Sequence, residues 1–90
     1  MSQSNKNKTT VHIYNRKYTI VGEEHPHHMQ VIASMVDEKM REIQEANPSL
    51  DTAKLAVLTA VNAMNDYVKI DEEYTSLIEQ MRRGERRKNG

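Results

Sequence analysis

Apolar and polar residues alternate near the start of the chain. The apolar positions of this stretch are Val11, Ile13, Tyr18 and Ile20, which lie on either side of Asn15-Arg16. A period of two is typical of a strand with one buried face, and Asn tolerates the positive φ that a two-residue turn requires. With Asn15 and Arg16 as the loop, Ile13 faces Tyr18 and Val11 faces Ile20. The pattern predicts a two-stranded β-hairpin with one apolar face.

The period changes after Pro26, a residue that suits the first turn of a helix. Apolar residues then recur at steps of three and four, at Met29, Ile32, Ala33, Val36, Met40 and Ile43. This spacing indicates an amphipathic helix. Its end is expected at Asn47-Pro48, because proline has no amide hydrogen and biases the preceding residue away from helical geometry. The helix is expected to cover the apolar face of the hairpin.

A second helix is predicted after Asp51, which is a suitable N-terminal cap. One apolar stripe repeats at alternating steps of four and three, as in a coiled-coil seam. We call this set the seam; its members are Ala56, Ala60, Ala63, Tyr67, Ile70, Tyr74, Leu77 and Met81. A neighbouring stripe consists of Val57, Val61, Met64 and Val68 and ends there. The helix is therefore expected to be contacted on two sides up to Val68 and to continue as a stalk.

These elements predict an α+β fold with an N-terminal β-hairpin, one amphipathic helix and a second long helix that continues into a coiled-coil stalk. The expected organisation is a disordered tail at 1–8, a head at 9–68, a stalk at 69–83 and a basic disordered tail at 84–90. Only 37% of the 90 residues are hydrophobic, and Phe and Trp are absent. Because such a core is thin and the seam would otherwise face water, an oligomer is predicted.

Composition removes several classes of function. Thirteen basic and thirteen acidic residues cancel, so no whole-molecule field attracts nucleic acid or membrane. The absence of cysteine excludes disulfides and thiol nucleophiles and favours an intracellular location. No apolar run approaches the roughly 20 residues that span a bilayer, and the first ten residues do not resemble a secretory signal. Without a phosphate-binding loop or a recognisable catalytic constellation, neither an enzyme nor a cofactor is expected.

Two clusters hold candidate chemistry. His25, His27 and His28 carry imidazoles that suit zinc, but their spacing matches no ligand motif, so no metal site is predicted. The segment from Arg82 to Lys88 is rich in arginine and could contact phosphates. Nucleic-acid binding by a coiled-coil dimer through this segment is the alternative function. Gly84 and Glu85 interrupt the run and no aromatic residues are interleaved, which disfavours that alternative.

Arg16 differs from these two clusters, because it is expected in a tight turn, where its side chain is not needed for packing. An exposed arginine on a rigid hairpin suits contact with an acidic partner, although a solvated turn residue is the plainer interpretation.

Three segments together resemble one family. They are the hairpin VHIYNRKYTIVG, the helix IASMVDEKMREIQEANP and the stretch KLAVLTAVNAMNDY. In this order, between Thr9 and Met81, they are similar to the bacterial cell division protein ZapA family. The resemblance implies a cytoplasmic homodimer or homotetramer at the division septum that binds the tubulin-like GTPase FtsZ and cross-links or bundles its protofilaments.

The resemblance also implies roles for particular residues. Partner contact is expected at Arg16 with its neighbour Lys17, and at Asp51, which lies two residues before the position where some members carry an acidic residue. Oligomerisation is expected to involve Leu58, which matches an apolar position important for head assembly, together with the seam from Ala60 onward. Neither a membrane nor a cofactor is implied.

Overall fold

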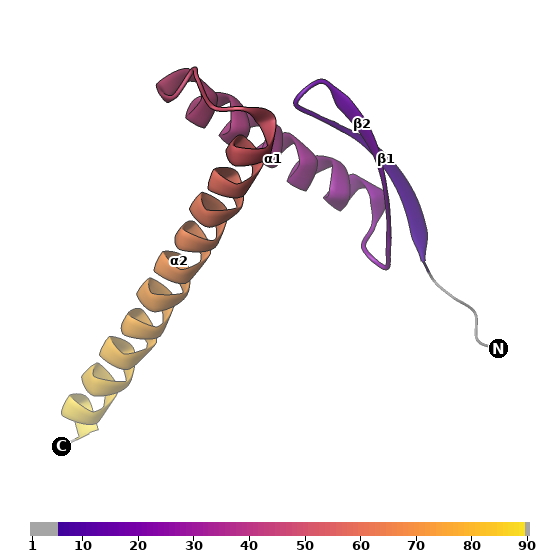
Figure 1. Ribbon diagram of the computed structural model, residues 1–90. Helices are drawn as coiled ribbons and strands as arrows, with labels where there is room; N and C mark the ends of the chain where they lie inside the picture. Colours follow the sequence, from indigo (N-terminus) through magenta and orange to yellow (C-terminus); the bar gives the residue numbers. More distant parts are fainter. Residues whose placement is uncertain (1–5, 90) are drawn as a thin grey trace. The chain divides into compact units, whose positions relative to one another are not determined.

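The computed structural model describes the backbone of residues 6–89 and the side chains of residues 6–84. Its elements are β1 (Asn7–Ile13), β2 (Arg16–Gly22), α1 (Pro26–Ala46) and α2 (Thr52–Asn89), shown in Figure 1. The predicted α+β class is confirmed. The chain divides into two compact units, Met1–Thr59 and Ala60–Gly90.

The hairpin forms as predicted, but its predicted register is wrong. Ile13 pairs with Arg16 and Val11 pairs with Tyr18, so the turn residues are Tyr14 and Asn15 rather than Asn15 and Arg16. Both adopt positive φ, 51° at Tyr14 and 66° at Asn15. Two positive φ values in succession are the mark of a type I′ turn, whose twist matches that of the flanking strands.

The displaced register preserves the predicted apolar face. Each pairing moves by two residues, and a shift of two leaves every side chain on its original side of the sheet. Val11 is fully buried on this covered face, and Thr9 beside it on β1 is also buried. The opposite face, which includes Thr10 and Val21, is exposed.

The core of the first unit is small. Among the described residues it consists of four buried apolar side chains, those of Val11, Ala33, Met40 and Leu55. Helix α1 packs against β1, while β2 makes its contacts with β1. Gln30 Nε2 of α1 donates to the Thr10 carbonyl of β1 at 2.9 Å, and Asn7 Nδ2 of β1 donates to the carbonyl of Glu24, in the loop before α1, at 3.0 Å. The hairpin is thus anchored to α1 along β1.

Both predicted helix starts are found. Pro26 is the first residue of α1, and the backbone N–H of His27 donates to Nδ1 of His25 at 3.0 Å, so a histidine caps this helix. At α2 the Asp51 carboxylate accepts the backbone N–H of Lys54 at 2.8 Å, as expected of a cap. Helix α1 ends at Ala46, directly before Asn47-Pro48 as predicted.

The expected tails differ from the structure at both ends. Strand β1 begins at Asn7, inside the segment expected to be disordered, because residues 7 and 8 find pairing partners on β2. Helix α2 extends to Asn89, so residues 84–89 continue the helix instead of forming a tail. Residues 1–5 and 90 lie outside the described part of the chain. The predicted boundary between head and stalk after residue 68 stays a prediction.

Candidate protein-binding site

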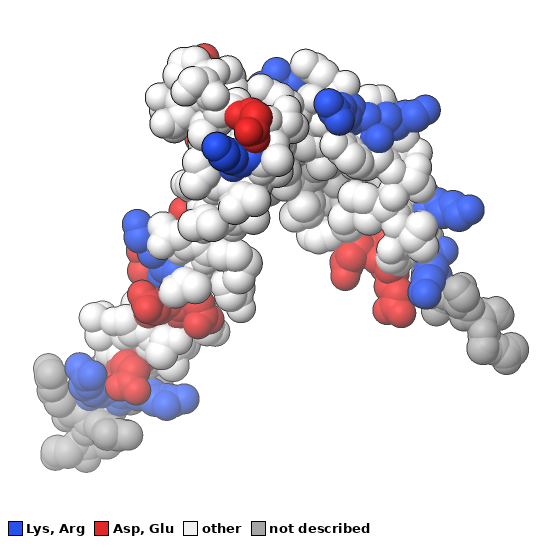
Figure 2. Space-filling view, viewed as in Figure 1, with Lys and Arg blue, Asp and Glu red and all other residues white. Residues whose placement is uncertain are grey.

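The charged side chains of the hairpin are all basic. Residues 6–22 contain four basic side chains, Lys6, Lys8, Arg16 and Lys17, and no Asp or Glu. The four are exposed, and Figure 2 shows Lys and Arg side chains gathered over the hairpin. A local patch of this kind attracts an acidic surface although the whole chain has no net charge.

The structure separates the two predicted contact residues of this hairpin. Arg16 and Lys17 are the first residues of β2 and not turn residues, which corrects the predicted position of Arg16. Successive side chains in a strand point to opposite faces. Arg16 therefore lies at the rim of the covered face, whereas Lys17 lies on the open face opposite His12. Among the described side chains, that of Arg16 forms no hydrogen bond or ion pair.

Two residues of α1 hold the hairpin turn, and sequence reasoning missed them. The Asp37 carboxylate accepts the backbone N–H of Tyr14 at 2.6 Å. Arg41 Nη2 donates to Asn15 Oδ1 at 3.2 Å, and its guanidinium carbon lies 5.5 Å from the centre of the Tyr14 ring. We call these two residues of α1 the turn clamp. Their spacing of four is visible in the sequence, but the turn residues that they contact, 23 and 26 residues earlier, cannot be found from it.

The members of the turn clamp also bind each other. Arg41 Nε donates to Asp37 Oδ2 at 2.9 Å, and Arg41 Nη2 donates to Asp37 Oδ1 at 3.2 Å. The hydrogen bond from Arg41, followed by that from the Tyr14 backbone, lowers the pKa of Asp37 below its ordinary value. The same pairing raises the pKa of Arg41. Both groups are therefore charged at neutral pH, as a two-pronged carboxylate–guanidinium pair requires.

Asp51, the third predicted contact residue, has a structural task. One of its carboxylate oxygens caps α2 through the Lys54 backbone N–H. This hydrogen bond accounts for an aspartate at the start of the helix without any contact to another protein. A role for Asp51 in partner contact therefore stays a prediction.

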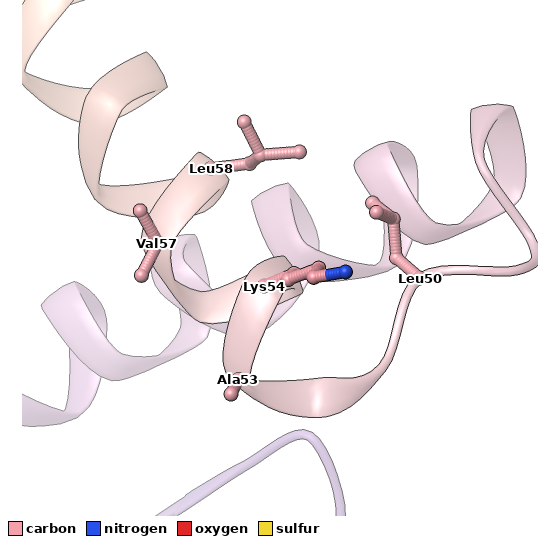
Figure 3. A pocket seen from close by; sticks show the side chains of 5 residues that line it. All are labelled: Leu50, Ala53, Lys54, Val57 and Leu58. Atoms are coloured by element: carbon pink, nitrogen blue, oxygen red, sulfur yellow. The ribbon is translucent and has the colours of Figure 1, made fainter.

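An apolar pocket of about 370 Å³ lies at the start of α2, within the first unit. It is lined by Leu50, Ala53, Lys54, Val57 and Leu58. Figure 3 shows Leu50 on the loop before the helix and Leu58 two turns along it, with Lys54 between them. Leu58, the residue predicted to take part in head assembly, thus lines a concave apolar surface.

Within the second unit, the predicted seam is exposed along α2. Its members there are Ala60, Ala63, Tyr67, Ile70, Tyr74, Leu77 and Met81, all exposed. The large ones are more than half exposed, from 53% at Leu77 to 65% at Ile70. The neighbouring stripe is exposed as well, at Val61, Met64 and Val68. An uninterrupted apolar surface of this length, left in water, indicates a contact with another chain.

Several of the remaining candidate residues have local partners. His28 lies 3.9 Å from Glu24, and His25 caps α1, so two of the three histidines are engaged at the helix start. Within the described residues, no group of three or more His, Cys, Asp or Glu side chains could hold a metal ion.

Arg83 pairs with Glu79 at 3.4 Å, while the basic side chains at 86–88 lie beyond those described. No described helix has the length and apolar character needed to cross a membrane.

A basic hairpin and a long helix with an uncovered apolar seam define a class, namely small oligomeric α+β proteins whose surfaces suit protein–protein contact. Comparison with known proteins then gives the family. Residues 9–88 match the family described as cell division protein ZapA, and the chain belongs to the ZapA family.

Relatives and solved structures agree with this assignment. The chain is 58% identical over 85 residues to the ZapA of Oceanobacillus iheyensis, covering 94% of this chain and 99% of the relative. It is 56% identical over 82 residues to the ZapA of Bacillus subtilis strain 168, covering 91% and 96%. A ZapA mutant dimer from Geobacillus stearothermophilus has 48% identity and a TM-score of 0.71, with 91% and 95% covered. A structure described as an unknown conserved bacterial protein from Pseudomonas aeruginosa PAO1 has 28% identity and a TM-score of 0.62, with 88% and 90% covered.

Proposed function

We propose that this cell division protein binds FtsZ and cross-links or bundles its protofilaments at the division ring. It works there as a cytoplasmic homodimer or homotetramer at the septum. Membership of the ZapA family supports the role in division, and the dimeric relative from Geobacillus stearothermophilus supports self-association. The action is that of a scaffold, which requires no chemical step.

One observation carries the proposal: the seam from Tyr67 to Met81 is exposed in the single chain. Knobs at this spacing pack into the holes of a partner helix, so α2 pairs with α2 of a second copy. Alanines at 60 and 63 allow close approach, and the larger residues beyond them fill the seam. Each copy contributes one basic hairpin, and an oligomer therefore presents two or more of them.

A multivalent scaffold bundles filaments through effective concentration. Once one hairpin has bound a protofilament, the next binding event is tethered, so contacts that are individually weak become avid. Arg16 and Lys17 supply the basic contact, and Asp51 supplies an acidic contact on the same head. A guanidinium can hold a carboxylate with two parallel hydrogen bonds, which a lysine ammonium cannot do.

Sedimentation with polymerised FtsZ tests the proposal. Wild type is expected to co-sediment with the polymer and to increase the bundled fraction. Arg16→Ala is expected to keep its oligomeric mass by light scattering and to lose roughly ten- to a thousandfold in affinity. Arg16→Lys should recover part of the binding. The matched control is Thr19→Ala, an exposed substitution on the same strand, which should bind as wild type.

Two results would count against this function. If wild type fails to co-sediment with FtsZ polymer at any protein ratio, the proposed partner is wrong. If correctly assembled Arg16→Ala bundles as well as wild type, Arg16 is not part of the contact, while the scaffold itself stands.

A further inference from the structure

The turn of the hairpin has an unfavourable conformation for its first residue, Tyr14. Type I′ turns prefer Asn-Gly, because both central residues have positive φ and glycine has no Cβ to clash. Here Tyr14 stands at the first of these positions with φ of 51°. A bulky residue in the left-handed region is disfavoured, because its Cβ comes too close to the backbone. Such a conformation persists only where its surroundings hold it.

The turn clamp provides those surroundings. Asp37 binds the Tyr14 N–H, Arg41 binds the Asn15 side chain, and the Arg41 guanidinium lies by the Tyr14 ring. The paired side chains of the clamp restrain each other. Both turn residues are therefore contacted from one helix, by two side chains that are also hydrogen-bonded to each other.

The position of the clamp matters because Arg16 follows the turn directly. Arg16 is the first residue of β2, and its Cα is paired with that of Ile13 across the turn. Any change in the φ and ψ of Tyr14 or Asn15 redirects the chain at Arg16. The strand also sends Arg16 and Lys17 to opposite faces, so a register slip of one residue would exchange the faces that they occupy.

We infer that Asp37 and Arg41 are positioning residues for partner binding, which act by holding the Tyr14-Asn15 turn in the conformation that presents Arg16. This inference rests on the proposed function.

The plainer interpretation is a surface ion pair at positions i and i+4 of a helix. Such pairs contribute little, since solvent screens them. The chain contains a matched example in Glu79 and Arg83 on α2, with the same spacing and a separation of 3.4 Å. The difference lies in the target: Asp37 also accepts a backbone N–H from a segment 23 residues away. Its side chain is only 28% exposed, against 55% for Glu79.

The experiment measures FtsZ co-sedimentation, oligomeric mass and the exchange rate of the Tyr14 amide hydrogen by NMR. Asp37→Ala is expected to weaken co-sedimentation by about two- to thirtyfold, with unchanged mass and faster Tyr14 exchange. Asp37→Asn should recover part of both, because its amide oxygen can still accept the Tyr14 N–H. Arg41→Ala should resemble Asp37→Ala. Glu79→Ala, the matched control, should behave as wild type in all three measurements.

A double-mutant cycle separates positioning from direct contact. If Asp37 acts through Arg16, adding Asp37→Ala to Arg16→Ala should reduce binding by less than about twofold further. If Asp37 contacts the partner independently, the two losses multiply, and that result would overturn the positioning role.

The outcomes distinguish this inference from the proposed function. Lack of binding by wild type removes the proposed function and the positioning role with it. Binding by wild type together with equal binding by Asp37→Ala removes the positioning role alone. An unchanged exchange rate of the Tyr14 amide hydrogen in Asp37→Ala also overturns the positioning role, because Asp37 would then not restrain the turn.

Discussion

The carboxylate of Asp37 accepts the backbone N–H of Tyr14 at 2.6 Å, a bond between the middle of α1 and the tip of the hairpin. It is one of the few specific polar links between helix and hairpin in the described residues. Because only four apolar side chains are buried in the described part of the chain, such links define where the hairpin tip lies.

The link should be lost in acid. The pKa of Asp37 is lowered in the folded state, first by the hydrogen bond from Arg41 and then by that from Tyr14, below the ordinary 3.8. Folding therefore favours the carboxylate, and its stabilisation is present above 3.8 and lost as pH falls through the lowered pKa. The difference in unfolding midpoint between wild type and Asp37→Asn should be constant above about pH 5 and shrink towards zero in stronger acid. A difference that persists unchanged below the folded pKa would contradict the assignment.

Thr9→Val should stabilise the first unit. Thr9 is 4% exposed, and its hydroxyl oxygen has no hydrogen-bond partner among the described residues. Valine has the same shape and removes the unsatisfied group, so a gain of about 1 kcal/mol is expected. Thermal unfolding at one fixed protein concentration should show a rise of roughly 4 to 8 °C.

The neighbouring threonine provides the control. Thr10→Val changes an exposed residue of the same strand and should alter stability by less than about 0.5 kcal/mol. Equal effects of the two substitutions would show that β-propensity, not the buried hydroxyl, is responsible.

His25 should behave as a helix cap. Its Nδ1 accepts the backbone N–H of His27 at 3.0 Å, so His25→Ala leaves a terminal N–H of α1 without this partner. Loss of a cap costs about 1 kcal/mol, whereas His25→Asn keeps an acceptor and should match wild type or exceed it. Urea midpoints would check this. Wild-type stability in His25→Ala would mean that water replaces the cap without loss.

Charges placed on the seam should separate the copies. Ile70→Asp with Leu77→Asp puts two carboxylates where a partner helix would bury them, and the dissociation constant of the oligomer should rise at least about tenfold. Sedimentation velocity over a dilution series measures this shift. Ser76→Asp is the control, because Ser76 is an exposed polar residue of the same helix outside the seam. If the double variant and wild type have the same mass at every concentration, the seam is not the interface.

The order and type of the elements could be predicted from the sequence, because three strong signals coincide. These are the period of two around the turn, the proline pair that brackets α1 and the alternating steps along α2. The hairpin register could not be predicted by the same reasoning. A shift of two residues leaves the apolar face intact, so the alternation of apolar and polar residues cannot distinguish the two registers.

The contacts that favour the observed register over the predicted one come from outside the hairpin. By residue preference Asn15-Arg16 is the better local turn, because it places asparagine at the first central position of a type I′ turn, where Tyr14 stands in the structure. Asp37 and Arg41 compensate for Tyr14, and their contacts become visible only once α1 is folded beside β1. For the candidate site, the basic character of the hairpin could be predicted, but neither the turn clamp nor the position of Arg16 within β2 could be.

The four tyrosines have a consequence for measurement. Tyr14 and Tyr18 belong to the hairpin, and Tyr67 and Tyr74 belong to the seam. With no tryptophan present, the intrinsic fluorescence of the chain comes from these two pairs alone. Replacing either pair by phenylalanine leaves an optical signal that reports on the other region. One chain can thus be observed separately at the surface proposed to meet FtsZ and at the surface proposed to meet its own copy, without an attached dye.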